Sequence, residues 1–124
     1  MQRRGDQGEQ AAAAWLQRRL GIRCLLRNWR AGRDEIDLIC REGEVLVFVE
    51  VKTRSPGRRG TGFRSVNRRK RRAQRRAARA YLRALASPPR HFRFDVVEVV
   101  PENGNGITFH HHRGVALFRK RTRP

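Results

Sequence analysis

The sequence predicts an α/β sandwich built around a mixed central sheet. Three observations lead to this prediction: the order of helical and strand patterns, one apolar run that suits a strand buried on both faces, and a length of 124 residues, which fits one domain. The patterns follow the order helix, three strands, helix, strand, strand. We expect a single domain over residues 1–118 and a basic, disordered tail over residues 119–124.

The first half of the chain predicts one helix and three strands. The helix covers residues 6–20, with Asp6 as its N-cap and Gly21 just beyond its end. A short strand over residues 22–27 and a polar loop over 28–33 follow. Strands over 36–40 and 45–51 are joined by a tight turn at Glu42-Gly43. Because residues 45–51 are apolar at most positions, this strand should lie at the centre of the sheet.

The second half begins with a basic loop over residues 53–62. A helix over about residues 65–86 ends before two prolines, and strands are expected over 92–100 and, less regularly, over 107–118. Three consecutive histidines in the last strand, at 110–112, would alternate between faces, so we interpret them as surface residues and not as ligands of one metal ion.

The formal charge of +19, from 30 Lys and Arg against 11 Asp and Glu, favours a polyanionic partner. Nucleic acid suits this charge better than a membrane, because the longest apolar run spans only residues 45–49. No secretory signal pattern opens the sequence, so a cytoplasmic protein is expected. Cys24 and Cys40 lie among apolar strand residues and are interpreted as free buried thiols.

The basic residues concentrate in one part of the chain. Between Glu50 and Asp95 there is no acid, whereas fourteen residues from Arg54 to Arg90 are Arg or Lys. Like charges along one helix face repel each other unless phosphates lie beside them. We therefore expect contacts with a nucleic-acid backbone, most naturally DNA, from Arg54, Arg58, Arg59, Arg68, Lys70, Arg72, Arg75, Arg76, Arg79 and Arg83.

Three acids and a lysine cluster in the predicted hairpin. If Glu42-Gly43 is a two-residue loop, Asp37 lies opposite Phe48 and Glu35 lies opposite Glu50. Glu35, Asp37, Glu50 and Lys52 then share one sheet face, where carboxylates would bind Mg²⁺ or Mn²⁺ for phosphodiester hydrolysis. The alternative is that Glu35 and Glu50 are edge residues and that Lys52 is their salt-bridge partner.

Lysine is rare in this chain, which makes its position after Glu50 informative. Only Lys52, Lys70 and Lys120 are lysine among the 30 cationic residues. Lysine is a compact charge that can lose its proton, whereas arginine remains charged. This choice suggests that the chemistry at residue 52 matters.

Asp37 and Glu50-Val51-Lys52, with Glu9 on the preceding helix, resemble the motif of the PD-(D/E)xK nuclease superfamily. Their spacing is similar to that in archaeal Holliday-junction resolvases. Over nearly the whole chain the sequence is similar to the YraN-like family of small bacterial proteins. The matching segments are 28–30, 35–39, 47–54 (VFVEVKTR), Lys70 and 94–97. Where that family usually has glycine before Glu-Ile-Asp, this chain has Asp34.

The resemblance implies a restriction-endonuclease-like fold and a metal-dependent endonuclease. Asp37 and Glu50 would bind the metal ion together with Val51, and Lys52 would be the catalytic lysine. Glu9 would complete the site from the first helix, or else only cap that helix; Glu35 would support the site or bind a second ion.

Branched or structured DNA is the expected substrate, in recombination or repair. A homodimer is one arrangement that would supply the two active sites of a resolvase. The alternative is a non-catalytic protein with the same fold, either a DNA clamp or adaptor or an RNA-associated protein.

Overall fold

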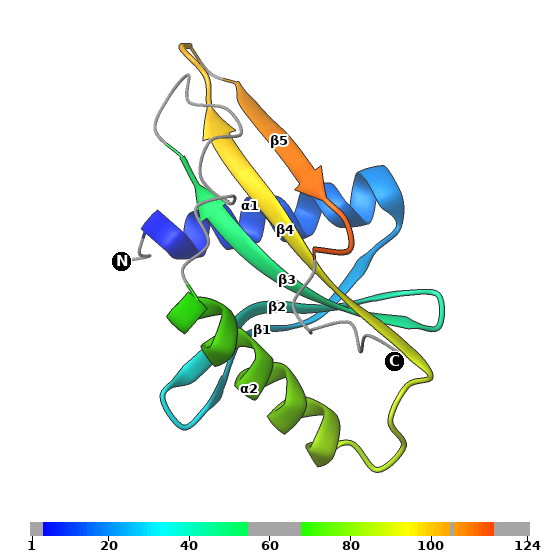
Figure 1. Ribbon diagram of the computed structural model, residues 1–124. Coiled ribbons are helices and arrows are strands. Elements are labelled where there is room, and N and C mark those ends of the chain that lie inside the picture. Colours follow the sequence, from blue (N-terminus) through cyan, green and yellow to red (C-terminus); the bar gives the residue numbers. More distant parts are fainter. Residues whose placement is uncertain (1–3, 55–67, 105, 116–124) are drawn as a thin grey trace, which may run out of the picture.

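The structure, a computed structural model, describes residues 4–54, 68–104 and 106–115. One five-stranded sheet has a helix on each face (Figure 1). The elements are α1 (Arg4–Leu20), β1 (Arg23–Ala31), β2 (Asp34–Glu42), β3 (Val45–Thr53), α2 (Arg68–Ala84), β4 (His91–Pro101) and β5 (Ile107–His112). This order confirms the predicted α-β-β-β-α-β-β sandwich.

The strands lie side by side in the order β1-β2-β3-β4-β5, so β3 is the central strand, as predicted. Only β3 and β4 run parallel, and α2 lies in the connection between them. Along β3, Val47 and Val49 pack in the cluster that contains α1, whereas Leu46 and Phe48 pack in the cluster that contains α2. Alternation along one strand therefore divides the core into two layers.

Helix α1 begins at Arg4, two residues before the predicted N-cap, and its buried face includes Ala12 and Leu16. A Cβ atom added to Gly8 would collide with the hydroxyl oxygen of Thr53. Glycine at this position thus lets the start of α1 lie close to the end of β3. The next residue, Glu9, is buried there with 8% of its surface exposed.

Strand β1 is longer than predicted. It continues through the expected loop over residues 28–33 as far as Ala31, and the turn occurs at Gly32. Asn28 has a φ angle of 55°, a conformation that asparagine tolerates better than most residues, so the strand can pass through a local distortion without ending. Strand β5 ends at His112, before the predicted boundary at residue 118.

The predicted position of the turn between β2 and β3 was also wrong by one residue. Glu42 lies opposite Val45, so the turn consists of Gly43 and Glu44, with Gly43 at a φ angle of 59°. A left-handed first turn residue suits a tight hairpin. The pairing is shifted by two residues relative to the prediction, which changes the opposed partners but not the face that either strand presents.

Pairing between β2 and β3 stops at Leu38 and Val49. Beyond that pair, the start of β2 pairs with β1, and the end of β3 pairs with β4. The two strands therefore diverge beyond Leu38 and Val49, and we call this point the β2–β3 fork. The predicted pairing of Glu35 with Glu50 is wrong, because the β2–β3 pairing ends at Leu38 and Val49 and reaches neither residue.

Neither helix in the described part of the chain is long and apolar enough to cross a membrane. Arg58, Arg59 and the predicted tail over residues 119–124 lie outside the described residues.

Candidate acid–lysine site

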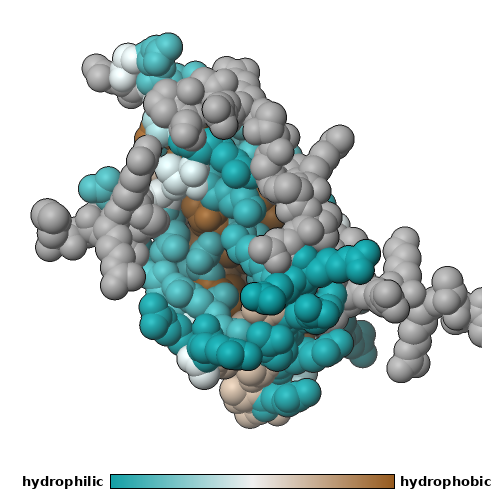
Figure 2. Space-filling view, turned by 60° about the vertical axis from the view of Figure 1, so that its left-hand side comes forward, coloured by the Kyte–Doolittle hydropathy of each residue, from teal (hydrophilic) through white to brown (hydrophobic). Residues whose placement is uncertain are grey.

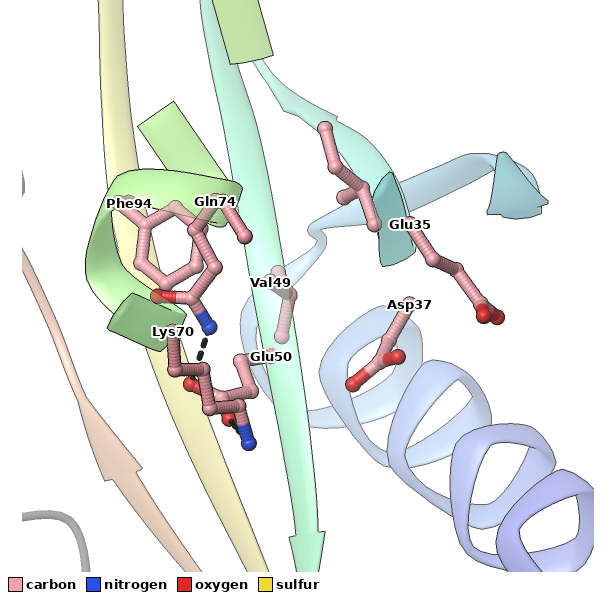
Figure 3. Close-up of a pocket in the computed structure, with 9 residues that line it drawn as sticks. Glu35, Asp37, Val49, Glu50, Lys70, Gln74 and Phe94 are labelled. Carbon is pink, nitrogen blue, oxygen red and sulfur yellow. Dashed lines mark hydrogen bonds and ion pairs between the residues drawn. The ribbon is translucent and has the colours of Figure 1, made fainter. Parts of the chain in front are cut away.

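A pocket of about 210 Å³ lies where β2 and β3 diverge, beneath the start of α2. Glu35 and Asp37 contribute from β2, Glu50 from β3, and Lys70 and Gln74 from α2 (Figure 3). The structure thus brings together Asp37 and Glu50, the two acids expected to bind a metal ion.

Asp37 bridges the fork. Its Oδ2 atom accepts a hydrogen bond of 2.8 Å from the backbone N–H of Val51. Burial, helped by repulsion from Glu50 and Glu35, raises the pKa of Asp37 from its usual 3.8 to about 6, against the opposing effects of the Val51 hydrogen bond and of Lys70. Asp37 therefore resists ionising beside the Glu50 carboxylate, and a cation between the two acids would be favourable.

Glu50 is 6% exposed and is held from several sides. The Nε2 atom of Gln74 donates a 2.7 Å hydrogen bond to its Oε2 atom, while Lys70 contacts Oε1. The Nζ atom of Lys52 lies 3.3 Å from the same Oε1 atom. Burial opposes ionisation, but the contacts with Lys70 and Gln74 outweigh it, so the pKa of Glu50 is lowered.

The two lysines respond differently to this shared carboxylate. Burial lowers the pKa of Lys52; Glu50 opposes that shift, but the neighbouring Lys70 adds to it. The pKa of Lys70 is raised, because its contacts with Glu50 outweigh its own desolvation. Lys70 therefore holds its proton more firmly than Lys52 does.

Gln74 was missed by the sequence analysis, and Lys70 was assigned only to the basic surface. A signal was available: Gln74 lies on the buried side of α2, three and four residues before Ala77 and Ala78. Lys70 is one turn earlier on the same side. A glutamine in the apolar stripe of a helix rich in Arg and Ala requires a buried partner, which is Glu50.

Glu35 and Glu9 are less closely tied to the pocket. The Glu35 side chain is 35% exposed and forms an ion pair of 3.6 Å with Arg30. Glu9 is buried on α1 and is not among the residues that line the pocket.

The donor atoms suit a hard divalent cation. Mg²⁺ is commonly bound by one or two carboxylates, with water and substrate phosphate completing its shell. Among the described residues no group of three or more His, Cys, Asp or Glu side chains is arranged to hold a metal ion. Asp37 and Glu50, which both line the pocket, would each offer one carboxylate. The Oε1 atom of Gln74 is buried without a hydrogen-bond partner among the described residues. An unsatisfied oxygen beside Glu50 fits a site that takes up water or a cation.

Two further acids on β4 are fully buried, and they bind two of the predicted surface histidines. His111 Nε2 lies 2.8 Å from Asp95, and His112 Nε2 lies 2.6 Å from Glu98. The interpretation of these histidines as surface residues was therefore wrong, because β5 pairs with β4 and directs both rings towards buried carboxylates. Asp95 itself is fully buried and hydrogen-bonded.

The predicted basic surface is smaller than expected. Arg54 donates a 2.9 Å hydrogen bond to buried Glu98, and Arg76 makes two hydrogen bonds of 3.0 Å to Asp34. Arg54 therefore stabilises the end of β3, and Asp34 neutralises the charge of Arg76. Arg68, Arg72, Arg79 and Arg83 are exposed on α2, and Arg75 is half-buried. In Figure 2 hydrophilic side chains surround a smaller hydrophobic area on the face turned forward.

The fold and the pocket define a class of small basic α/β proteins with paired acids and lysines at a strand fork. The model of the uncharacterised protein family UPF0102 matches residues 8–99, and the chain belongs to that family. This is the YraN-like family that the sequence motifs indicated.

Relatives occur in distant bacteria. A UPF0102 protein of Symbiobacterium thermophilum is 52% identical over 97 residues, which cover 78% of this chain and 81% of the relative. A UPF0102 protein of Parafrankia sp. is 42% identical over 113 residues, covering 91% of this chain and 95% of the relative. A third, from Moorella thermoacetica, is 48% identical over 97 residues, covering 78% and 80%.

Proposed function

We propose that this protein is a divalent-metal-dependent endonuclease that acts on branched or otherwise structured DNA. The observation that carries the proposal is the convergence of Asp37, Glu50 and Lys52 at the β2–β3 fork, beside a helix rich in exposed arginines. Paired carboxylates with an adjacent lysine suit phosphodiester hydrolysis.

Each residue has a distinct role in this proposal. Asp37 and Glu50 would hold Mg²⁺ or Mn²⁺, with Val51 as a further ligand, and the ion would supply Lewis-acid polarisation of a phosphate oxygen. Lys52 stabilises negative charge that develops at the phosphate. The exposed arginines of α2 position the backbone without reading its sequence. DNA geometry would then select the substrate.

The direct test is a cleavage assay on single-stranded, duplex, flap and four-way-junction DNA, with matching RNAs, in Mg²⁺, Mn²⁺, Ca²⁺ or EDTA. Wild type is expected to cut one of the DNA forms in Mg²⁺ or Mn²⁺, and Glu50→Gln, purified identically, is expected not to cut. Cleavage that persists in Glu50→Gln would show a contaminant or another active site. Salt-sensitive binding without any cleavage would favour the DNA-clamp alternative, and preference for structured RNA the RNA-associated one.

Binding should depend on the exposed arginines of α2. Affinity for DNA is expected to fall with salt, with a log–log slope of roughly −0.9 per phosphate contacted. Arg72→Gln and Arg83→Gln should each reduce affinity across all sequences and make the slope shallower by about one. Fluorescence anisotropy at several salt concentrations measures both.

The matched control is Arg41→Gln, because Arg41 is exposed near the β2–β3 turn, at the opposite end of β2 from Asp37. It removes the same charge and should leave the slope unchanged. Equal effects of all three substitutions would show that net charge, and not α2, determines binding.

A further inference from the structure

Two of the three lysines in this chain meet at one oxygen atom. Lys52 and Lys70 both contact Oε1 of Glu50, although 27 of the 30 cationic residues are arginine. A compact ammonium can share an oxygen with a second ammonium and can leave it again, whereas a guanidinium tends to form a planar, two-pronged pair with the carboxylate. The choice of lysine at residue 70 therefore suggests a contact that forms and breaks.

Helix α2 covers both oxygens of the proposed metal ligand. Lys70 contacts Oε1 of Glu50, and Gln74, one turn later, donates to Oε2 (Figure 3). When a divalent ion approaches Glu50, the Oε1 atom that would bind it is already in contact with the ammonium group of Lys70. Like charges at this separation repel strongly, so ion and ammonium would compete for the same position.

Lys70 is placed so that it can leave. Its side chain is 50% exposed, whereas that of Glu50 is 7% exposed. Rotation of the flexible lysine stem can carry the ammonium group outwards without a change in the helix. Its neighbours Arg68, Arg69 and Arg72 are exposed on the same helix, where a DNA backbone would supply phosphates.

We propose that Lys70 blocks the metal site in the absence of DNA and transfers to a backbone phosphate when DNA binds, so that DNA and the divalent ion bind cooperatively. This inference rests on the proposed function and adds a regulatory contact to the same site. Coupling of this kind is reciprocal, since a ligand that removes Lys70 from Glu50 favours the other ligand by the same factor. Metal would then be held tightly only where a substrate backbone is present.

The test is Mn²⁺ binding, followed by the electron paramagnetic resonance signal of free Mn²⁺. Without DNA, Lys70→Met is expected to bind Mn²⁺ at least about tenfold more tightly than wild type, a change equivalent to one decade in the dissociation constant. A saturating four-way junction should tighten Mn²⁺ binding by wild type and have much less effect on Lys70→Met. A parallel titration of Glu50→Gln with the same DNA measures how much Mn²⁺ the DNA itself binds. A gel verifies that the DNA remains intact during the titration.

Two controls separate the contact from net charge and from misfolding. Arg69→Met removes the same charge from an adjacent exposed position and should leave Mn²⁺ affinity within about twofold of wild type. Lys70→Arg keeps a cation near Glu50 and should bind Mn²⁺ no more tightly than wild type. Thermal unfolding of each variant verifies that it is folded.

Equal Mn²⁺ affinity in folded wild type and Lys70→Met would overturn the inference, and so would an equal gain in Arg69→Met. Its failure differs from failure of the proposed function. If wild type cleaves DNA in a metal-dependent way but Lys70→Met has the same Mn²⁺ affinity as wild type, the nuclease proposal stands and the blocking role of Lys70 fails. If Mn²⁺ binding depends on Lys70 but no substrate is cleaved, the blocking role of Lys70 stands and the nuclease proposal fails.

Discussion

The Asp37→Asn variant is expected to be more stable than wild type in metal-free buffer at pH 8, and to lose metal-dependent cleavage. Asparagine can still accept the hydrogen bond from Val51, but it carries no charge against Glu50 and Glu35. The raised pKa of Asp37, about 6 against 3.8, corresponds to roughly 1–3 kcal/mol after allowance for partial exposure. Cleavage should fall by ~10³-fold or more, because a metal ion contributes several kcal/mol to such reactions.

The pH dependence of this gain has a definite sign. The folded pKa of Asp37 lies above the unfolded value, so folded protein binds more protons between the two values. The contribution of this carboxyl group to stability is fully present below pH 3.8 and is lost as the pH rises through about 6. The difference between Asp37→Asn and wild type should therefore be small at pH 4.5 and largest at pH 7–8.

Urea unfolding of both proteins in EDTA at several pH values measures this difference. Added Mg²⁺ should stabilise wild type and not the variant, because ligand that binds only the folded state raises its stability. A variant that is less stable than wild type at pH 8, or a difference that does not change with pH, would contradict the assignment of Asp37 as a strained functional carboxylate.

Asp95→Ala is expected to cause the largest loss of stability, on the order of 3–5 kcal/mol, because it leaves a buried ionic network without its anion. Asp95 is fully buried and accepts hydrogen bonds from Arg93 at 3.0 and 3.1 Å and from the backbone N–H of Gly114 at 2.9 Å, and it contacts His111. A domain of this size has only about 5–15 kcal/mol of stability, so the loss amounts to at least about a fifth of the total.

Acid should have a related effect on wild type. Burial opposes ionisation of Asp95, but His111, Gly114 and Arg93 together outweigh it and lower the pKa. The stability from this carboxylate is present above its unfolded pKa of 3.8 and is lost as the pH falls through the lower, folded value. Asp95→Ala should therefore flatten the decline in stability below pH 4.

Denaturant midpoints of wild type, Asp95→Ala and Asp34→Asn provide the measurement and its control. Asp34 also pairs with an arginine, Arg76, but the Arg76 side chain is half exposed. Loss of this ion pair in Asp34→Asn should therefore shift the midpoint little. If the two substitutions cost the same, the Asp95 network does not anchor β5 to β4.

The sequence alone determined the order of the elements and the central position of β3. Both follow from local patterns: apolar residues at helical spacing define the helices, and a run that is apolar on successive positions must be buried on both faces of a sheet. The β2–β3 turn was predicted one residue too early, but the resulting shift of two residues leaves the face of each paired residue unchanged.

Only the tertiary structure decided which groups surround Glu50 and where the strands separate. The rotation of α2 about its axis, set by the packing of Ala77 and Ala78 on the sheet, directs Lys70 and Gln74 to that carboxylate. Likewise, the pairing of β5 with β4 carries His111 to Asp95, far from it in sequence. Such contacts depend on packing between distant segments, which the periodicity of a single segment does not encode.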